Sequence, residues 1–310
     1  MEDLFLKRHI SPMLCFDSQP FDSKDFVFEL KLDGIRCVAY LSQNEVSLKN
    51  KKDKEILGTF PELKNINKCV QKNCILDGEL VCLGEDNKPD FFAIQSRCLK
   101  TNKFKIELAQ KLSPVQYCVF DILYYDNKNL VNLPLLERKK YLEKFVLEQN
   151  GLTLSRYIFT QGKDFFELTK QQSLEGIVAK KKDSIYQIGK RSESWLKIKT
   201  FNEDDVIICA YELNKDGHLR TTLFGTYDKN GQFVILGKVS LGILPYQKII
   251  TSQPKSVPLS NKYPKMHWIK PTLVAMVKYL IKTESGSFRQ PVLKGIRDDK
   301  TAEDIKKEAR

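Results

Sequence analysis

The sequence lacks the features that mark secreted, membrane-spanning and zinc-binding proteins. No apolar run is long enough to cross a bilayer, and residues 1–5 do not form the basic start of a signal peptide. The eight cysteines include no Cys-x-x-Cys pair and have no nearby histidine partner, so we expect buried reduced thiols. There is also no internal repeat and no low-complexity segment. These absences favour a cytoplasmic protein that does not bind a membrane.

The composition is that of a folded protein with an anionic partner. Hydrophobic residues make up 42% of the 310 residues, and this length suggests about two domains. Lysine and arginine total 51 against 39 aspartates and glutamates, which gives a net charge of +12. Because basic side chains release counterions when they neutralise phosphates, this excess favours nucleic acid as the partner. A basic protein without such a partner would have the same composition.

One short segment, residues 29–36, brings together a lysine, a carboxylate, a glycine and an arginine: Lys31, Asp33, Gly34 and Arg36. Strand-like apolar runs flank it, so the Asp-Gly step predicts a tight turn in a hairpin, with Lys31 at a strand end. A free lysine has a pKa of ~10.4 and cannot attack while protonated. Desolvation, neighbouring cations and a bound metal would all favour the neutral amine. Taken alone, the segment fits either a solvated lysine or a covalent nucleophile.

Hydrophobic patterns predict further elements before residue 200. Strands are expected at 45–48, 75–82, 115–125, 174–181 and 194–199, and helices at 91 onward, 134–148 and 163–172. Glu79 interrupts an apolar run, where a carboxylate is costly unless it is paired or binds a sugar hydroxyl or a metal. Phe120 fits either core packing or stacking on a base. Lys197 and Lys199 fall on one strand face, which suits either a phosphate or a solvent-facing edge strand.

The pattern changes near residue 200. Short strand-like runs follow at 206–211, 221–227, 233–239 and 273–281, separated by Gly, Asn and Asp turns, with a helix from Thr301. This spacing is typical of a small β-barrel. We therefore expect two domains, residues 1–200 and 201–310.

Six motifs occur in one order along the chain: Lys31-x-Asp33-Gly34-x-Arg36, Asp77-Gly78-Glu79, Phe120-Asp121, Glu175-Gly176-x-Val178-x-Lys180, Trp195-x-Lys197-x-Lys199 and Arg297-x-Asp299-Lys300. In order and spacing they resemble the motifs of the covalent nucleotidyltransferases. From about residue 10 to 305 the chain resembles a minimal bacterial ATP-dependent DNA ligase. The resemblance implies an α+β nucleotidyltransferase (adenylation) domain with antiparallel sheets, followed by an all-β OB-fold barrel.

The resemblance also implies an activity, the sealing of 5′-phosphate/3′-hydroxyl nicks or breaks in duplex DNA during repair. Lys31 would take AMP from ATP and pass it to the 5′-phosphate, and the 3′-hydroxyl would then displace it. Mg²⁺ or Mn²⁺ would stabilise the charge in each phosphoryl transfer. The implied protein is a monomer of the bacterial nucleoid that binds nicked DNA and repair proteins.

The same resemblance assigns roles to individual residues. Lys31 is the implied nucleophile. Glu29 would contact the adenine amine, Phe120 would stack on the base, and Leu30 would also bind the nucleotide. Glu79 would hold the ribose, and Arg36 would lie near the ribose or the nick phosphate. Lys197 and Lys199 would contact the α-phosphate, and Arg297 with Lys300 would orient the leaving pyrophosphate. The implied contacts to the nick phosphate are Arg36, Lys49 and Arg191. The implied metal ligands are Glu175, Asp33 and Glu79.

Two positions depart from the family's pattern. Lys49 stands where an arginine is usual, which keeps the charge but loses the bidentate fork. Met276 replaces a commonly acidic residue. A GTP-dependent capping-type guanylyltransferase or an RNA ligase would share part of the motif set. A non-catalytic nucleic-acid-binding module is disfavoured, because every candidate catalytic position carries suitable chemistry.

Overall fold

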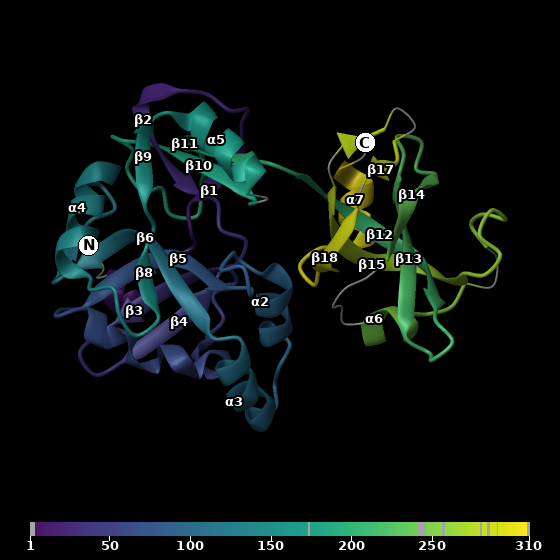
Figure 1. The fold of residues 1–310 in the computed structure, drawn as a ribbon, viewed down its shortest axis with the longest axis horizontal. Coiled ribbons are helices and arrows are strands. Elements are labelled where there is room, and N and C mark those ends of the chain that lie inside the picture. Colours follow the sequence, from purple (N-terminus) through teal and green to yellow (C-terminus); the bar gives the residue numbers. More distant parts are fainter. Residues whose placement is uncertain are drawn as a thin grey trace. The chain divides into compact units, whose positions relative to one another are not determined.

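The computed structural model describes residues 4–172, 174–240, 246–255, 258–279, 281–283, 286–289 and 291–308. Figure 1 shows two compact units, Met1–Thr200 (unit 1) and Phe201–Arg310 (unit 2). No helix in these described ranges is long and apolar enough to cross a membrane.

Unit 1 contains two sheets in its described residues. One, sheet A, has the strand order β1-β11-β10-β2-β9; the other, sheet B, has the order β4-β3-β5-β6-β7, with β8 beside β6. Neighbouring strands are antiparallel except in the pairs β1–β11 and β6–β8. The strands are β1 (Leu14–Asp17), β2 (Ser23–Leu30), β3 (Ile35–Leu41), β4 (Val46–Asn50), β5 (Cys74–Cys82), β6 (Val115–Tyr125), β7 (Lys128–Asn129), β8 (Leu152–Leu154), β9 (Tyr157–Thr160), β10 (Gly176–Lys181) and β11 (Arg191–Lys199).

The segment after β2 crosses from sheet A to sheet B. β2 pairs with β9 and β10, whereas β3 pairs with β4 and β5, so the predicted hairpin around Asp33 is wrong. The Asp-Gly step marks a change of direction, but the choice of strand partners depends on which apolar faces pack together. A Cβ on Gly34 would lie 2.2 Å from the Leu80 carbonyl oxygen, so this close approach of two backbones requires glycine.

Three helices of unit 1, α2, α4 and α5, lie close to the ranges that the sequence predicts. Asp90 caps α2, accepting a hydrogen bond from the Ala93 N–H at 3.0 Å, and α4 begins directly after Pro134 but ends three residues before the predicted 148. The sequence patterns did not predict α3, β8 or β9. The helices of unit 1 are α1 (Leu4–Lys7), α2 (Phe91–Cys98), α3 (Lys103–Leu112), α4 (Leu135–Phe145) and α5 (Gly162–Gln171), with 3₁₀ segments at Leu57–Thr59 and Pro61–Cys69.

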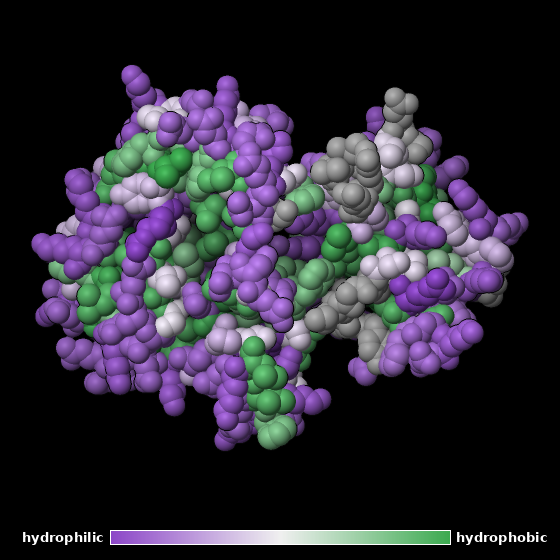
Figure 2. Space-filling model, viewed as in Figure 1, coloured by the Kyte–Doolittle hydropathy of each residue, from purple (hydrophilic) through white to green (hydrophobic). Residues whose placement is uncertain are grey.

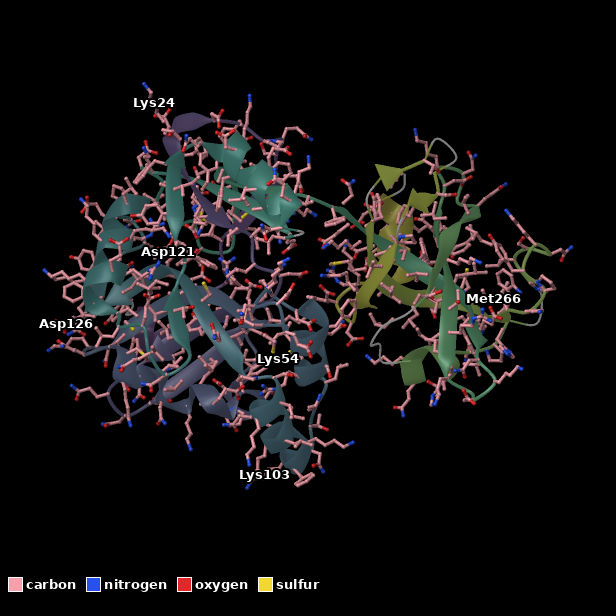
Figure 3. All side chains as sticks on the ribbon, in the orientation of Figure 1. Lys24, Lys54, Lys103, Asp121, Asp126 and Met266 are labelled. Atoms are coloured by element: carbon pink, nitrogen blue, oxygen red, sulfur yellow. The ribbon has the colours of Figure 1, made fainter. Side chains whose placement is uncertain are left out.

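A buried ion pair joins α4 to β6. The Arg138 guanidinium makes two hydrogen bonds of 2.8 Å to the Asp121 carboxylate, and neither side chain is exposed. Figure 3 shows Asp121 inside unit 1, whereas Lys24 and Lys103 project from its surface. Removing either partner would leave an uncompensated buried charge, so this pair fixes α4 against the strand that carries Phe120.

The visible surface of unit 1 is mostly hydrophilic (Figure 2). An apolar patch lies over α3, where Phe104 and Leu112 are each 73% exposed. All eight cysteines are free thiols, and Cys98 is exposed, unlike the buried thiols that the sequence predicts.

Unit 2 is built on an antiparallel sheet with the order β14-β13-β12-β15-β18. Its predicted strands are confirmed, although the last one ends at Tyr279, and a helix follows Thr301 as expected. Val206, Phe224 and Val277 lie in its buried core. The elements are β12 (Asn202–Leu213), β13 (Leu219–Tyr227), β14 (Phe233–Ser240), α6 (Tyr246–Ile250), β15 (His267–Tyr279), β16 (Ile281–Lys282), β17 (Phe288–Arg289), β18 (Val292–Ile296) and α7 (Ala302–Glu308).

Candidate active site

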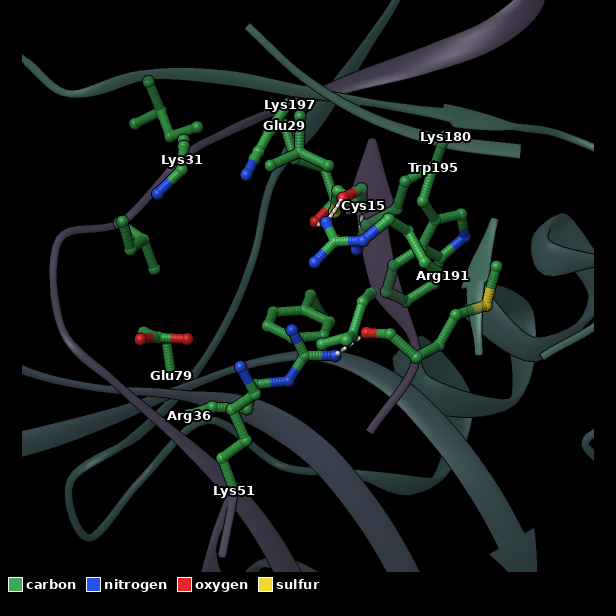
Figure 4. A pocket seen from close by; sticks show the side chains of 16 residues that line it. Cys15, Glu29, Lys31, Arg36, Lys51, Glu79, Lys180, Arg191, Trp195 and Lys197 are labelled. Carbon is green, nitrogen blue, oxygen red and sulfur yellow. Dashed lines mark hydrogen bonds and ion pairs between the residues drawn. The ribbon is translucent and has the colours of Figure 1, made fainter. Parts of the chain in front are cut away.

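A cavity of about 260 Å³ lies in unit 1, lined by side chains of both sheets (Figure 4). It brings together most of the residues singled out in the sequence. Sheet A and its loops contribute Glu29, Leu30, Lys31, Arg191 and Lys197. Sheet B contributes Arg36, Glu79 and Phe120.

Strand register explains why sheet A presents several cations to this cavity. Glu29 pairs with Val178 on β10, and Val178 pairs with Lys197 on β11. Side chains alternate along a strand, so Lys199, two residues after Lys197, lies on the same face. Asp17 on β1 approaches both lysines, at 3.3 Å from Lys197 and 4.0 Å from Lys199. The prediction that the two lysines share a face is confirmed.

Lys31 forms an ion pair with Glu175. The Lys31 backbone N–H donates to the Gly176 carbonyl at 2.9 Å, which continues the β2–β10 pairing by one residue. This contact places the Lys31 ammonium 2.5 Å from the Glu175 carboxylate. The Lys31 side chain keeps 22% of its surface exposed, whereas that of Glu175 keeps 6%. A carboxylate this close favours the charged form of the lysine.

Glu29 lies between two lysines at the base of the cavity. One oxygen of its carboxylate is 2.7 Å from the Lys139 ammonium and 3.0 Å from that of Lys180, and Ser155 donates to the other at 2.9 Å. Burial alone would raise the pKa of Glu29, but the two lysines hold it below its usual value. Glu29 is therefore a fixed, ionised acceptor.

Arg36 forms a rigid part of the opposite wall. Its guanidinium makes two hydrogen bonds of 2.6 Å to Asp77, which is fully buried and also accepts from the Tyr186 hydroxyl at 2.6 Å. The same guanidinium lies 4.5 Å from the centre of the Phe120 ring. This bidentate pair fixes the arginine against the aromatic side chain.

Phe120 lies at an irregularity in β6. Asp77 pairs with Asp121 and Gly78 pairs with Val119, so Phe120 has no direct partner on β5. A bulge of this kind turns a side chain relative to its neighbours. The Lys180 ammonium lies 4.1 Å from the centre of the Phe120 ring.

Glu79 faces the cavity that Lys31 also lines (Figure 4). Burial raises the pKa of Glu79 to about 8, although the nearby charges of Arg36 and Lys31 act in the opposite direction. This raised pKa favours the protonated form of the carboxyl in the protein alone. The apolar strand tolerates Glu79 because the neutral form of a carboxyl group costs less to bury than the charged form.

The predicted contacts to the nick phosphate and the pyrophosphate are spread over both units. Arg191 donates to the Cys15 carbonyl at the cavity, whereas the Lys49 ammonium binds the Arg8 carbonyl at 2.5 Å and does not line the cavity in the described part of unit 1. Arg297 and Lys300 lie in unit 2, where both pair with Asp205, at 3.1 and 2.8 Å. Their roles toward a nucleotide or a nick stay predictions.

The predicted metal ligands, Glu175, Asp33 and Glu79, suit only one of the ways in which proteins hold Mg²⁺. Among the described residues, no group of three or more His, Cys, Asp or Glu side chains could hold a metal ion. Mg²⁺ is commonly held by one or two carboxylates together with the phosphates of a substrate. Glu175 and Glu79 fit that mode, with Asp33 in the adjoining loop, and their role as ligands stays a prediction.

Sequence reasoning gave no role to three residues of this site. Asp77 anchors Arg36, Lys180 contacts Glu29, and Lys139 contacts Glu29 from helix α4. One signal was available for Lys139. It lies four residues after Leu135 and three before Leu142, on the apolar face of a predicted helix, where a lysine needs a partner.

The cavity and its lysine have the chemistry that suits a nucleotide, and comparisons with known proteins identify the family. Residues 12–199 match the ATP dependent DNA ligase domain, and residues 215–300 match the ATP dependent DNA ligase C terminal region. The chain is 32% identical over 203 residues to the SPbeta prophage-derived DNA ligase-like protein LigB of Bacillus subtilis, covering 65% of this chain and 72% of LigB.

Longer relatives match over nearly the whole chain. The multifunctional non-homologous end joining protein LigD of Mycolicibacterium smegmatis is 28% identical over 95% of this chain, which spans 39% of that protein. A solved structure, mycobacterial DNA ligase D complexed with ATP and MES, aligns over 96% of this chain and 98% of its own with a TM-score of 0.77 and 26% identity. The chain belongs to the ATP-dependent DNA ligase family of covalent nucleotidyltransferases. Unit 1 has the family's α+β nucleotidyltransferase fold, and unit 2 is its OB-fold-type domain.

Proposed function

We propose that the protein seals 5′-phosphate/3′-hydroxyl nicks or breaks in duplex DNA through AMP carried on Lys31. The observation that carries this proposal is that Lys31 lines a cavity together with Glu29 and Phe120, which suit an adenine, and with Lys197, which suits a phosphate. We assign residues 1–200 to the adenylation domain and residues 201–310 to the OB-fold domain.

The reaction has three phosphoryl transfers. The Lys31 amine loses a proton and forms a bond to the α-phosphorus of ATP, and pyrophosphate leaves. An oxygen of the DNA 5′-phosphate then attacks the same phosphorus and breaks the bond to nitrogen. The 3′-hydroxyl finally attacks the 5′-phosphate, which forms the new phosphodiester and releases AMP.

The chain's own residues bind and orient the reactants in these steps. Glu29 accepts a hydrogen bond from the adenine amine, Phe120 stacks on the base, and Lys197 with Lys199 neutralises the α-phosphate. Arg36 contacts the ribose or the nick phosphate. A divalent metal, Mg²⁺ or Mn²⁺, with Glu175 and Glu79 as its candidate ligands and Asp33 nearby, supplies further charge stabilisation.

The proposed setting is DNA repair. Relatives of this chain include proteins named for non-homologous end joining, and we propose that this ligase acts at DNA breaks. We also propose that it acts as a monomer in the bacterial nucleoid. The net charge of +12 suits a protein that binds DNA directly. Repair proteins that present broken ends are the expected partners.

The test is formation of a covalent adduct. Protein freed of bound nucleotide is mixed with labelled ATP and a divalent metal, and the label on the denatured protein is measured. Wild type and Lys24→Ala, which changes an exposed lysine on β2, should acquire the label, whereas Lys31→Ala should not. Release of the label on addition of nicked duplex, with a sealed strand as product, completes the assignment.

Two results would overturn the proposal. A wild-type protein that labels with GTP and not with ATP would indicate a capping-type enzyme. A protein that labels with ATP but seals only RNA would indicate an RNA ligase.

A further inference from the structure

Lys139 is a buried lysine that contacts two parts of the nucleotide site at once. It lies on α4 with 1% of its surface exposed. Its ammonium is 2.7 Å from one oxygen of Glu29 and donates a hydrogen bond to the backbone carbonyl of Phe120 at 3.1 Å. One cation therefore joins the residue proposed to bind the adenine amine to the strand whose aromatic ring is proposed to stack on the base.

Lys139 acts on the cavity through these residues. It is not among the described residues that line the 260 Å³ cavity, whereas Glu29 and Phe120 are. Its ring contact is with Tyr157, whose centre lies 5.0 Å from the ammonium, and Tyr157 pairs with Glu29 across β9 and β2. The lysine thus contacts Glu29 from outside this cavity.

Glu29 keeps acceptor capacity in this arrangement. An ionised carboxylate offers about four acceptor positions. Ser155 and Lys180 donate to one oxygen, at 2.9 and 3.0 Å. The other oxygen is ion-paired with the two lysines but accepts no hydrogen bond of regular geometry among the described residues. This oxygen is buried, but Glu29 lines the cavity, so an amine that packs against the carboxylate there would meet an unfilled acceptor position.

We propose that Lys139 is a positioning residue for adenine selection, which it achieves by holding Glu29 and the Phe120 backbone in a single arrangement. This inference rests on the proposed function. A fixed carboxylate accepts a hydrogen bond from the amine of adenine and repels the carbonyl oxygen that hypoxanthine carries at the same position. A carboxylate that can turn away discriminates less between the two bases.

The test compares ATP with ITP, which differ at this position of the base. The rate of lysyl-nucleotide formation at low nucleotide concentration is measured for the wild type and for Lys139→Met, which keeps the chain length without the charge. We expect the ATP-to-ITP rate ratio to fall about tenfold, since a hydrogen bond to a charged group is weakened. The loss should arise mainly from a slower reaction with ATP.

Two further variants separate positioning from general damage. Lys140→Met changes the next residue of α4, whose side chain is 69% exposed, and should keep the wild-type ratio. Ser155→Ala removes one small donor to Glu29 and should lower the ratio in the same direction by a smaller factor. Thermal unfolding of each protein shows whether it folds. If Lys139→Met does not fold, Ser155→Ala still tests whether the ratio depends on how Glu29 is held.

The possible results are distinct. A Lys139→Met protein that folds and loses activity equally with ATP and ITP would overturn the inference, because Lys139 would then be purely structural. If Ser155→Ala folds and Lys139→Met does not, an unchanged ATP-to-ITP rate ratio in Ser155→Ala would overturn the inference as well. A wild type that forms the adduct equally well from both nucleotides would overturn it while leaving the ligase proposal intact. A wild type that forms no adduct with any nucleotide would instead overturn the proposed function.

Discussion

The ammonium of Lys31 lies 2.5 Å from the carboxylate of Glu175, although 144 residues separate them in the chain. Antiparallel pairing of β2 with β10 brings the two residues together at the end of the sheet. The carboxylate favours the charged lysine, whereas attack on a phosphate needs the neutral amine. A charged Lys31 must therefore lose its proton before it can attack a phosphate.

Glu175→Gln should slow adenylylation of Lys31 by roughly 100-fold, because the nearest carboxylate that can orient or accept the lysine proton is lost. The measurement is single-turnover labelling with ATP at several pH values. Glu167→Gln, which changes an exposed glutamate on α5, serves as the matched control and should react at the wild-type rate. An unchanged rate in Glu175→Gln would show that the ion pair has no part in the first step.

Gly176→Ala should destabilise unit 1 by at least about 2 kcal/mol and reduce adenylylation. Gly176 has a φ of +139°, and a Cβ there would lie 2.1 Å from the Ile198 carbonyl oxygen, so β10 would shift from β11 next to Glu175. Urea unfolding measures the loss. Gly58→Ala is the control, since a Cβ on Gly58 would meet no atom within 4 Å. Equal stability of the two variants would contradict the close approach.

Glu79→Gln should change how stability depends on pH. Burial raises the pKa of Glu79 from 4.5 to about 8, so between these values the native protein retains a proton that the unfolded chain has released. The free energy of unfolding of the wild type should therefore fall as the pH rises through this window, relative to Glu79→Gln. Urea unfolding at pH 5, 6, 7 and 8, within the window set by these pKa values, measures how the free energy of unfolding changes with pH. Parallel curves for the two proteins would show that Glu79 is ionised throughout.

Binding to nicked DNA should weaken steeply with salt, because lysines on the surface displace counterions from phosphates. Fluorescence anisotropy between about 50 and 200 mM salt gives the slope of log affinity against log concentration. Replacing the exposed Lys52 and Lys54 together by alanine should reduce that slope by about 1 to 2. A flat response of the wild type would show that its basic excess is not the DNA-binding surface.

Much of the local structure follows from sequence patterns. Alternation in residues 194–199 correctly places Lys197 and Lys199 on one face, and the helix expected from residue 91 onward is present as α2. These features depend on contacts between near neighbours in the chain. The Asp33-Gly34 step shows the limit, because the sequence predicts a turn there but not that β2 and β3 enter different sheets.

The sequence by itself determined the family motifs, the residue types that suit a nucleotide, and the strands on which most of them lie. Only the tertiary structure decided which of these residues meet. Lys31 pairs with Glu175, Lys139 is buried against Glu29, and burial raises the pKa of Glu79. The reason is physical: periodicity records which side of an element is apolar, whereas the charge and partner of a buried polar group depend on the strands and helices packed around it.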